Sequence, residues 1–118
     1  MEFICYPRCT TCKRAKTWLE EKGCEFKVRD IKENPPSYEE IKLFYEKSGL
    51  DIKKFFNTSG LSYKSLGLKD KLSNLSIEDK LKLLSSDGML IKRPILLINN
   101  NVLVGFKADA WAEAINSL

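Results

Sequence analysis

The sequence predicts an α/β domain built from two halves, with an all-helical insert between them. Short alternating segments rich in β-forming residues lie only near the two ends of the chain, whereas the middle, 37–86, shows only helical patterns. The first half has the order strand, helix, strand, and the second half has the order strand, strand, helix. With 118 residues, 43% of them hydrophobic, the chain is long enough for one compact domain with one core.

The first half begins with the alternating segment EFICY, which predicts a strand over 2–6 that ends at Pro7. A helix follows over 10–22, with Gly23 as its C-terminal cap. The segment 24–31 alternates again and predicts a second strand. Because a helix with short connections joins the two strands, we expect them to be parallel. One face of the helix carries Cys12, Ala15, Trp18 and Leu19.

The insert begins with a helix whose N-terminus has a capping-box pattern. Ser37 is followed three residues later by Glu40, and the helix is predicted to run as far as Gly49. Ser76 is the predicted cap of a later helix, which ends at the turn beginning with Asp87. These signals predict helices and turns but no strand in the insert.

The second half contains two β-forming segments around Asn99–Asn101, which predicts a hairpin turn, and a last helix from about Ala108. The complete order is that of a thioredoxin-like fold, βαβ then ββα in a mixed sheet, with helices inserted in its middle. We therefore expect one domain over 1–118. Its thioredoxin-like core is predicted at about 1–33 and 89–118, with the helical insert at about 34–88.

Composition excludes several classes of function. The net charge is +4, and lysines alternate with acidic residues along the chain, so we expect no direct contact with nucleic acid. The longest apolar stretch, 94–98, is far shorter than the ~18 residues of a membrane span. The N-terminus has no leader-like pattern. We expect a cytoplasmic monomer.

The pair Cys9 and Cys12 is the main candidate for chemistry, and three interpretations compete. A zinc site needs two more ligands, but the chain has no histidine, and Cys5 and Cys24 do not have paired-knuckle spacing. A structural disulfide across four residues would remove little chain entropy. In a cytosolic protein, such a pair is more often catalytic or metal-binding than structural. The redox interpretation is therefore favoured, and no metal site is predicted.

The two cysteines are predicted to have different roles. A thiolate is the nucleophile, so the site must stabilise the anion. Cys9 lies at a helix N-terminus, which favours negative charge, and Arg8 precedes it directly. Cys12 is one turn into the helix and less exposed. We predict that Cys9 attacks and Cys12 resolves, whereas Cys5 and Cys24 are interpreted as small buried hydrophobic residues.

The sequence resembles the ArsC/Spx family, which includes glutaredoxin-dependent arsenate reductases and Spx transcription regulators. The resemblance is carried by YPRCTTCKRAKTWLEEKG, by FFNTSGLSYKSLGLKDKL in the insert, and by IKRPILL followed by VGFK. It implies a thioredoxin-like fold with a helical insert. It also implies that Cys9 is the catalytic nucleophile, that Arg93 is a catalytic anion-binding arginine, and that Pro94 is a cis-proline facing the site. An arginine has a planar fork suited to oxyanions, which agrees with this role.

Two further arginines of the arsenate reductases are absent. Asn57 stands where the resemblance places one, and Lys107 is the only positive residue near the other. Together with Arg8 and Pro94, these residues are the predicted substrate-positioning set. Because most of the oxyanion-binding charge is missing, we expect a disulfide substrate and weak arsenate activity. The resemblance implies glutathione, glutaredoxin or thioredoxin as reductant and no bound cofactor.

The resemblance to Spx supports an alternative function, a redox-sensing regulator. Spx proteins bind the RNA polymerase α subunit through a surface that includes a glycine of the insert and the arginine before the proline. Gly49 and Arg93 occupy similar places. A glycine after a helix is also a common C-cap, so Gly49 alone does not decide between the two functions.

Overall fold

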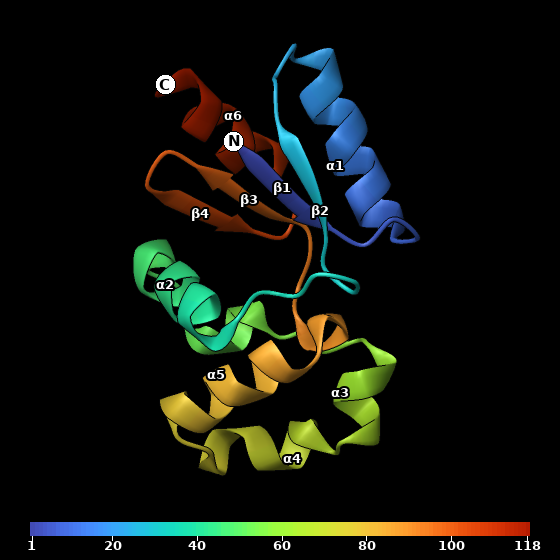
Figure 1. Cartoon of the computed structure of the whole chain (residues 1–118), viewed down its shortest axis with the longest axis vertical. Helices are drawn as coiled ribbons and strands as arrows, with labels where there is room; N and C mark the ends of the chain where they lie inside the picture. The colour runs from blue at the N-terminus through green and yellow to red at the C-terminus, as the bar shows by residue number, and fades with distance from the viewer. The chain divides into compact units, whose positions relative to one another are not determined.

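The computed structural model describes residues 1–118, which divide into two compact units (Figure 1). The sheet unit comprises Met1–Asp30 and Arg93–Leu118, and the helical unit comprises Ile31–Lys92. The sheet unit contains β1 (Glu2–Cys5), α1 (Thr10–Glu21), β2 (Lys27–Asp30), β3 (Ile95–Ile98), β4 (Asn101–Val104) and α6 (Ala108–Asn116). The helical unit contains α2 (Tyr38–Ser48), η1 (Ile52–Phe55), α3 (Leu61–Ser65), α4 (Leu68–Lys71), η2 (Leu72–Asn74), α5 (Ile77–Ser86) and η3 (Gly88–Leu90).

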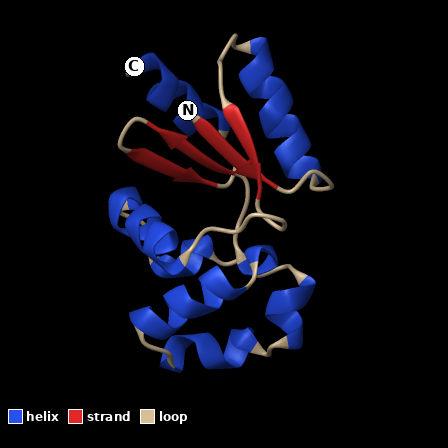
Figure 2. Ribbon diagram, in the orientation of Figure 1, coloured by secondary structure: helices blue, strands red, loops and turns tan.

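The four strands form one mixed sheet in the order β2-β1-β3-β4. β1 and β2 are parallel, as the short helical connection between them predicts, with Phe3 opposite Val28. β3 is antiparallel to both β1 and β4. The fold is thus the predicted mixed α/β arrangement of βαβ and ββα, and all of its strands belong to the sheet unit (Figure 2).

Several boundaries differ from the predicted ones by one to three residues. β2 begins at Lys27 rather than at Cys24, because the backbone N–H of Cys24 donates to the Leu19 carbonyl at the end of α1 (3.1 Å). The hairpin turn is shorter than predicted, since Asn101 pairs with Ile98 and belongs to β4. Asn99 has a φ of 53°, the left-handed conformation that asparagine tolerates in a two-residue turn.

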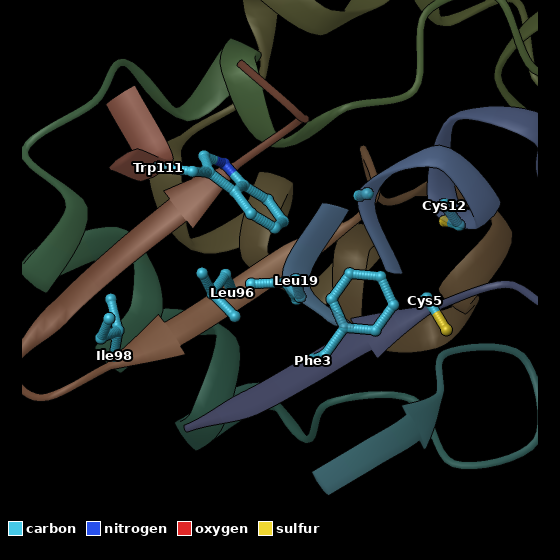
Figure 3. Close-up of a cluster of buried hydrophobic side chains, with 8 residues drawn as sticks. Phe3, Cys5, Cys12, Leu19, Leu96, Ile98 and Trp111 are labelled. Atoms are coloured by element: carbon cyan, nitrogen blue, oxygen red, sulfur yellow. The ribbon is translucent and has the colours of Figure 1, made fainter. Parts of the chain in front are cut away.

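A buried apolar cluster holds α1 and α6 on one face of the sheet (Figure 3). Alternate residues of a strand point to the same side, so Phe3 and Cys5 of β1 face the same way. α1 contributes residues at helical spacing to the same cluster. The members are Phe3, Cys5, Cys12, Ala15, Leu19, Leu96, Ile98 and Trp111, each at most 4% exposed. The start of α1 is therefore packed directly against the end of β1.

The two tryptophans, both predicted to be core residues, differ in burial. Trp111 of α6 is 1% exposed, and its indole Nε1–H donates to the Gly105 carbonyl (3.1 Å). Its ring makes edge-to-face contacts with Phe3, Phe106 and Trp18. Trp18 of α1 is only half-buried, and the ammonium of Lys22 lies over its ring (5.5 Å). Trp111 is thus the better anchored of the two.

The helical unit has the helix starts that the sequence predicts at Ser37 and Ser76. Ser37 and Glu40 form both hydrogen bonds of a capping box at α2. The Ser76 side chain accepts from the Asp79 backbone at the start of α5 (3.0 Å). α2 ends at Gly49 in the left-handed conformation. None of the helices in the chain has the length and apolar character needed to span a membrane.

We predict that Trp111→Phe lowers the free energy of unfolding by about 2 kcal/mol or more, because it leaves the buried Gly105 carbonyl unpaired and a void in the core. The matched variant Trp18→Phe should cost about 1 kcal/mol or less, because that ring is half-buried. Urea denaturation of the two variants and the parent measures both values. Equal losses would contradict the anchoring role of Trp111.

Candidate redox site

Cys9 is the N-cap residue of α1. Its backbone is extended (φ −80°, ψ 123°), its N–H donates to the Tyr6 carbonyl (2.9 Å), and its carbonyl accepts from Lys13 (3.0 Å). The sulfur makes no capping hydrogen bond to the helix, and the residue is half-buried. The turn after β1 therefore presents this thiol at the surface, at the positive end of a twelve-residue helix.

Cys12 lies one turn further along α1 and is 2% exposed. The backbone N–H of Tyr6 donates to its sulfur (3.4 Å). Cys9 packs against the buried cluster that contains Cys12, one turn of α1 away, but the two thiols differ in exposure. A substrate from solution reaches Cys9 first.

Cys5, the last residue of β1, is 4% exposed and belongs to the same buried cluster as Cys12. The neighbouring Cys12 thiol lowers the pKa of Cys5 against the opposing effect of burial. The Cys5 thiol raises the pKa of Cys12 above its ordinary value, and burial raises it further. Lys16 adds a smaller effect that lowers the pKa of Cys5. Of these two buried thiols, Cys5 is the one that ionises more readily.

Arg93 and Pro94 lie immediately before β3 in the sheet unit. The Arg93–Pro94 peptide bond is cis, as the resemblance implies. The Arg93 guanidinium lies over the ring of Tyr6, 5.1 Å from its centroid, which fits a cation–π contact. The N–H of Tyr6 donates to Cys12, so this residue connects Arg93 to the cysteine turn. Pro94 is buried, and its carbonyl accepts from Gly105 after β4 (2.8 Å).

The remaining predicted site residues occupy other places. Arg8 is exposed in the turn next to Cys9, and Lys107 is the exposed N-cap residue of α6. Asn57 belongs to the helical unit, where its backbone pairs with Leu90 (2.8 Å) and with Gly60 (3.1 Å). These two backbone hydrogen bonds are typical of a residue in a turn.

Gly49 also belongs to the helical unit. It is exposed, has a φ of 68°, and a Cβ added to it would meet no atom within 4 Å. Its conformation is that of a helix C-cap, and it leaves an open surface at the end of α2. No group of three or more Cys, Asp or Glu side chains in the chain is arranged to hold a metal ion.

Sequence reasoning missed one participant of the site, Tyr6. Cys5 is a buried residue of the apolar cluster, which agrees with its interpretation as a small hydrophobic residue. Tyr6 has no distinctive sequence signal, since its backbone N–H and its ring act through placement alone. Cys24, also interpreted as buried, is half-buried.

Comparisons with known proteins agree on one family. The sequence matches the model of the ArsC family over residues 5–114. It is 56% identical to the uncharacterized protein YusI of Bacillus subtilis, over 96% of each chain. It is 30% identical to the global transcriptional regulator Spx of Enterococcus faecalis, over 87% of this chain and 76% of Spx. A solved structure of an ArsC family related protein from Bacteroides fragilis aligns with a TM-score of 0.93 at 44% identity, covering 96% of this chain and 95% of that one.

We predict that Cys9 is alkylated faster than Cys5, Cys12 and Cys24 in the folded protein, because its thiol is accessible at a helix N-terminus. A short iodoacetamide pulse followed by tryptic mass spectrometry measures the order. Raising the pH to about 9 should not make Cys12 reactive, since burial and Cys5 raise its pKa. Dominant labelling of Cys12 would reverse the assigned roles.

Proposed function

Because the chain belongs to the ArsC family, which its sequence matches over residues 5–114, we propose that it is a thiol–disulfide oxidoreductase whose redox pair is Cys9 and Cys12. The observation that carries the proposal is the placement of one accessible thiol at the N-cap of α1 and one buried thiol one turn further along the helix. Attack on a disulfide requires an exposed thiolate, and release of the product requires a second thiol within reach.

The reaction proceeds in two exchange steps. The Cys9 thiolate attacks one sulfur of the substrate disulfide, forms a mixed disulfide, and releases the other substrate sulfur as a thiolate. Cys12 then loses its proton and attacks the Cys9 sulfur, which releases the second substrate thiolate and leaves a Cys9–Cys12 disulfide. The substrate gains two electrons and the cysteine pair loses two. A cytoplasmic thiol reductant, of the glutathione, glutaredoxin or thioredoxin class, restores the pair.

Arg93 is the proposed substrate-positioning residue. Its guanidinium packs on Tyr6 at the cysteine turn, and its fixed charge suits a carboxylate of a peptide or glutathione-like substrate. Arg8, exposed beside Cys9, and Lys107 at the start of α6 add positive charge to the same unit. The proposed substrate is therefore a disulfide with a nearby negative charge.

Arsenate is disfavoured as a substrate because the chain has too few positively charged hydrogen-bond donors for the arsenate oxygens. Each charge-assisted hydrogen bond to an oxyanion contributes roughly 1.5–3 kcal/mol, so two missing arginines cost about 3–6 kcal/mol in binding. That energy corresponds to a factor of at least ~100 in affinity. Lys107 supplies one positive charge, but its ammonium group cannot make the two parallel hydrogen bonds that an arginine guanidinium makes to an oxyanion.

We predict that the reduced protein cleaves the interchain disulfides of insulin in the presence of a thiol reductant, and that Cys9→Ser abolishes this activity. The turbidity of released insulin B chain measures the rate. Cys24→Ser is the matched control and should keep the parent rate, because Cys24 lies after α1 and not at its N-terminus. Insulin reduction that survives Cys9→Ser would contradict the assignment of Cys9 as nucleophile.

The same preparation should reduce arsenate weakly or not at all when glutaredoxin and glutathione are supplied. Robust arsenate turnover that requires Arg93 would show that the chain compensates for its missing arginines. It would make arsenate, rather than a disulfide, the substrate of the pair.

A redox-sensing transcription regulator is the second candidate function. It is favoured by the 30% identity to Spx of Enterococcus faecalis over 87% of this chain. Its partner would be the RNA polymerase α subunit, bound through the open surface at Gly49. The Cys9–Cys12 pair would then act as the sensor.

A pull-down from bacterial lysate with reduced and with oxidised protein separates the two candidates. The regulator predicts recovery of the α subunit with one redox form, and loss of recovery in Gly49→Asn, which keeps the left-handed conformation but adds a side chain. The oxidoreductase predicts no α subunit with either form. Recovery that is equal in both redox forms would contradict a sensing role for the pair.

A further inference from the structure

Tyr6 is the residue that contacts both the cysteine pair and Arg93. We propose that its ring is a positioning group, which holds the Arg93 guanidinium at the turn between β1 and α1 and so makes the site select disulfides that carry a carboxylate. The inference rests on the proposed function of the cysteine pair and adds to it a residue that determines specificity.

The backbone of Tyr6 is hydrogen-bonded to both cysteines of the pair. Its N–H donates to the Cys12 sulfur (3.4 Å), and its carbonyl accepts from the Cys9 N–H (2.9 Å). Tyr6 directly follows β1, so these two bonds join the end of the strand to the start of α1. Because both bonds use main-chain atoms of Tyr6, a substitution of its side chain leaves them available.

The side chain of Tyr6 has a different partner. The Arg93 guanidinium lies over the Tyr6 ring, 5.1 Å from the ring centroid, which is within the ~6 Å range of a cation–π contact. In such a contact the guanidinium uses its flat face, whereas its N–H donors lie along its edge. The contact therefore orients these donors toward a carboxylate without using them itself.

The backbone of Arg93 is fixed beside the sheet. The next residue, Pro94, is buried, its carbonyl accepts from Gly105 (2.8 Å), and β3 follows. Packing of the guanidinium on a ring removes much of the remaining freedom of a long side chain before a substrate binds. Tyr6 and Arg93 are both half-buried and belong to the same unit as Cys9, so a substrate from solution can reach the guanidinium.

The orientation of Arg93 matters because Cys9 is proposed to react as an anion. A thiolate repels a substrate that carries a carboxylate, and a guanidinium offsets this repulsion through charge-assisted hydrogen bonds. A neutral disulfide experiences neither effect. The ratio of the rates for anionic and neutral substrates isolates the contribution of Arg93, because a change in the ionised fraction of Cys9 alters both rates equally.

The test compares the two kinds of disulfide in a single turnover. Reduced protein is mixed with oxidised glutathione, which has a net negative charge, or with bis(2-hydroxyethyl) disulfide, which is neutral. Acid quenching and mass spectrometry measure the loss of the Cys9 thiol. We expect Tyr6→Leu to lower the ratio of the two rate constants roughly two- to fivefold, the loss that corresponds to one solvent-accessible cation–π contact. Tyr6→Phe keeps a ring and should retain the parent ratio.

A double substitution shows whether Tyr6 acts through Arg93. If it does, Tyr6→Leu should have no further effect on the ratio when Arg93→Met is already present. Lys22→Met is the matched control, because Lys22 also lies over an aromatic ring, that of Trp18 (5.5 Å), but at the opposite end of α1 from Cys9. This control should keep the parent ratio.

Alkylation of Cys9 gives the same comparison without any disulfide. Iodoacetate is anionic and iodoacetamide is neutral, so the ratio of their rates reports the charge near the thiol. Mass spectrometry of the tryptic peptide CTTCK measures both rates, and Tyr6→Leu should lower this ratio as well. A protein that reacts with neither disulfide would contradict the proposed function, and the alkylation ratios would then decide whether Tyr6 positions Arg93.

Three results would overturn the inference. If Tyr6→Leu kept both parent ratios, Arg93 would hold its place without the ring. Equal losses of the anionic and neutral rates would indicate a general disturbance of the turn that contains Cys9. A further fall of the ratio when Tyr6→Leu is added to Arg93→Met would mean that Tyr6 acts independently of the arginine.

Discussion

The burial of Cys12 beneath the start of α1 is the constraint on which the candidate site depends. Its sulfur accepts a hydrogen bond from the Tyr6 N–H, and the residue packs in the same buried cluster as Cys5, with Cys9 against that cluster. These contacts hold the first turn of the helix against the end of β1, and they leave Cys9 as the thiol that faces outward. The apolar cluster of Phe3, Leu19 and Trp111 keeps that junction in place.

The protein has no histidine, so no imidazole is available as a base at this site. Cys12 has a raised pKa, so in the proposed reaction it needs an acceptor for its proton before it can resolve a mixed disulfide. Cys5, whose pKa is lowered, lies in the same buried cluster. The rate of thiol–disulfide exchange depends on the thiolate fraction of the attacking sulfur.

The fold was predictable from sequence to a large extent, because strand alternation near both ends and the Ser37–Glu40 and Ser76 caps are local signals. Cys9 and Cys12 were predictable for the same reason, since their spacing on one helix sets their placement. The short turn between β1 and α1 also predicts that Cys5 lies near the start of the helix. The packing of Arg93 on the Tyr6 ring was not predictable, because it joins segments that are distant in the sequence.

The most direct test of the account is a trapping experiment with Cys12→Ser. Serine cannot resolve the mixed disulfide, so the account predicts that reduced Cys12→Ser incubated with insulin accumulates a covalent adduct. Tryptic mass spectrometry should place that adduct on Cys9, in the peptide that begins after Arg8. An adduct on Cys5 or Cys24, or no adduct while the parent protein reduces insulin, would contradict the assignment of Cys9 as attacking thiol and Cys12 as resolving thiol.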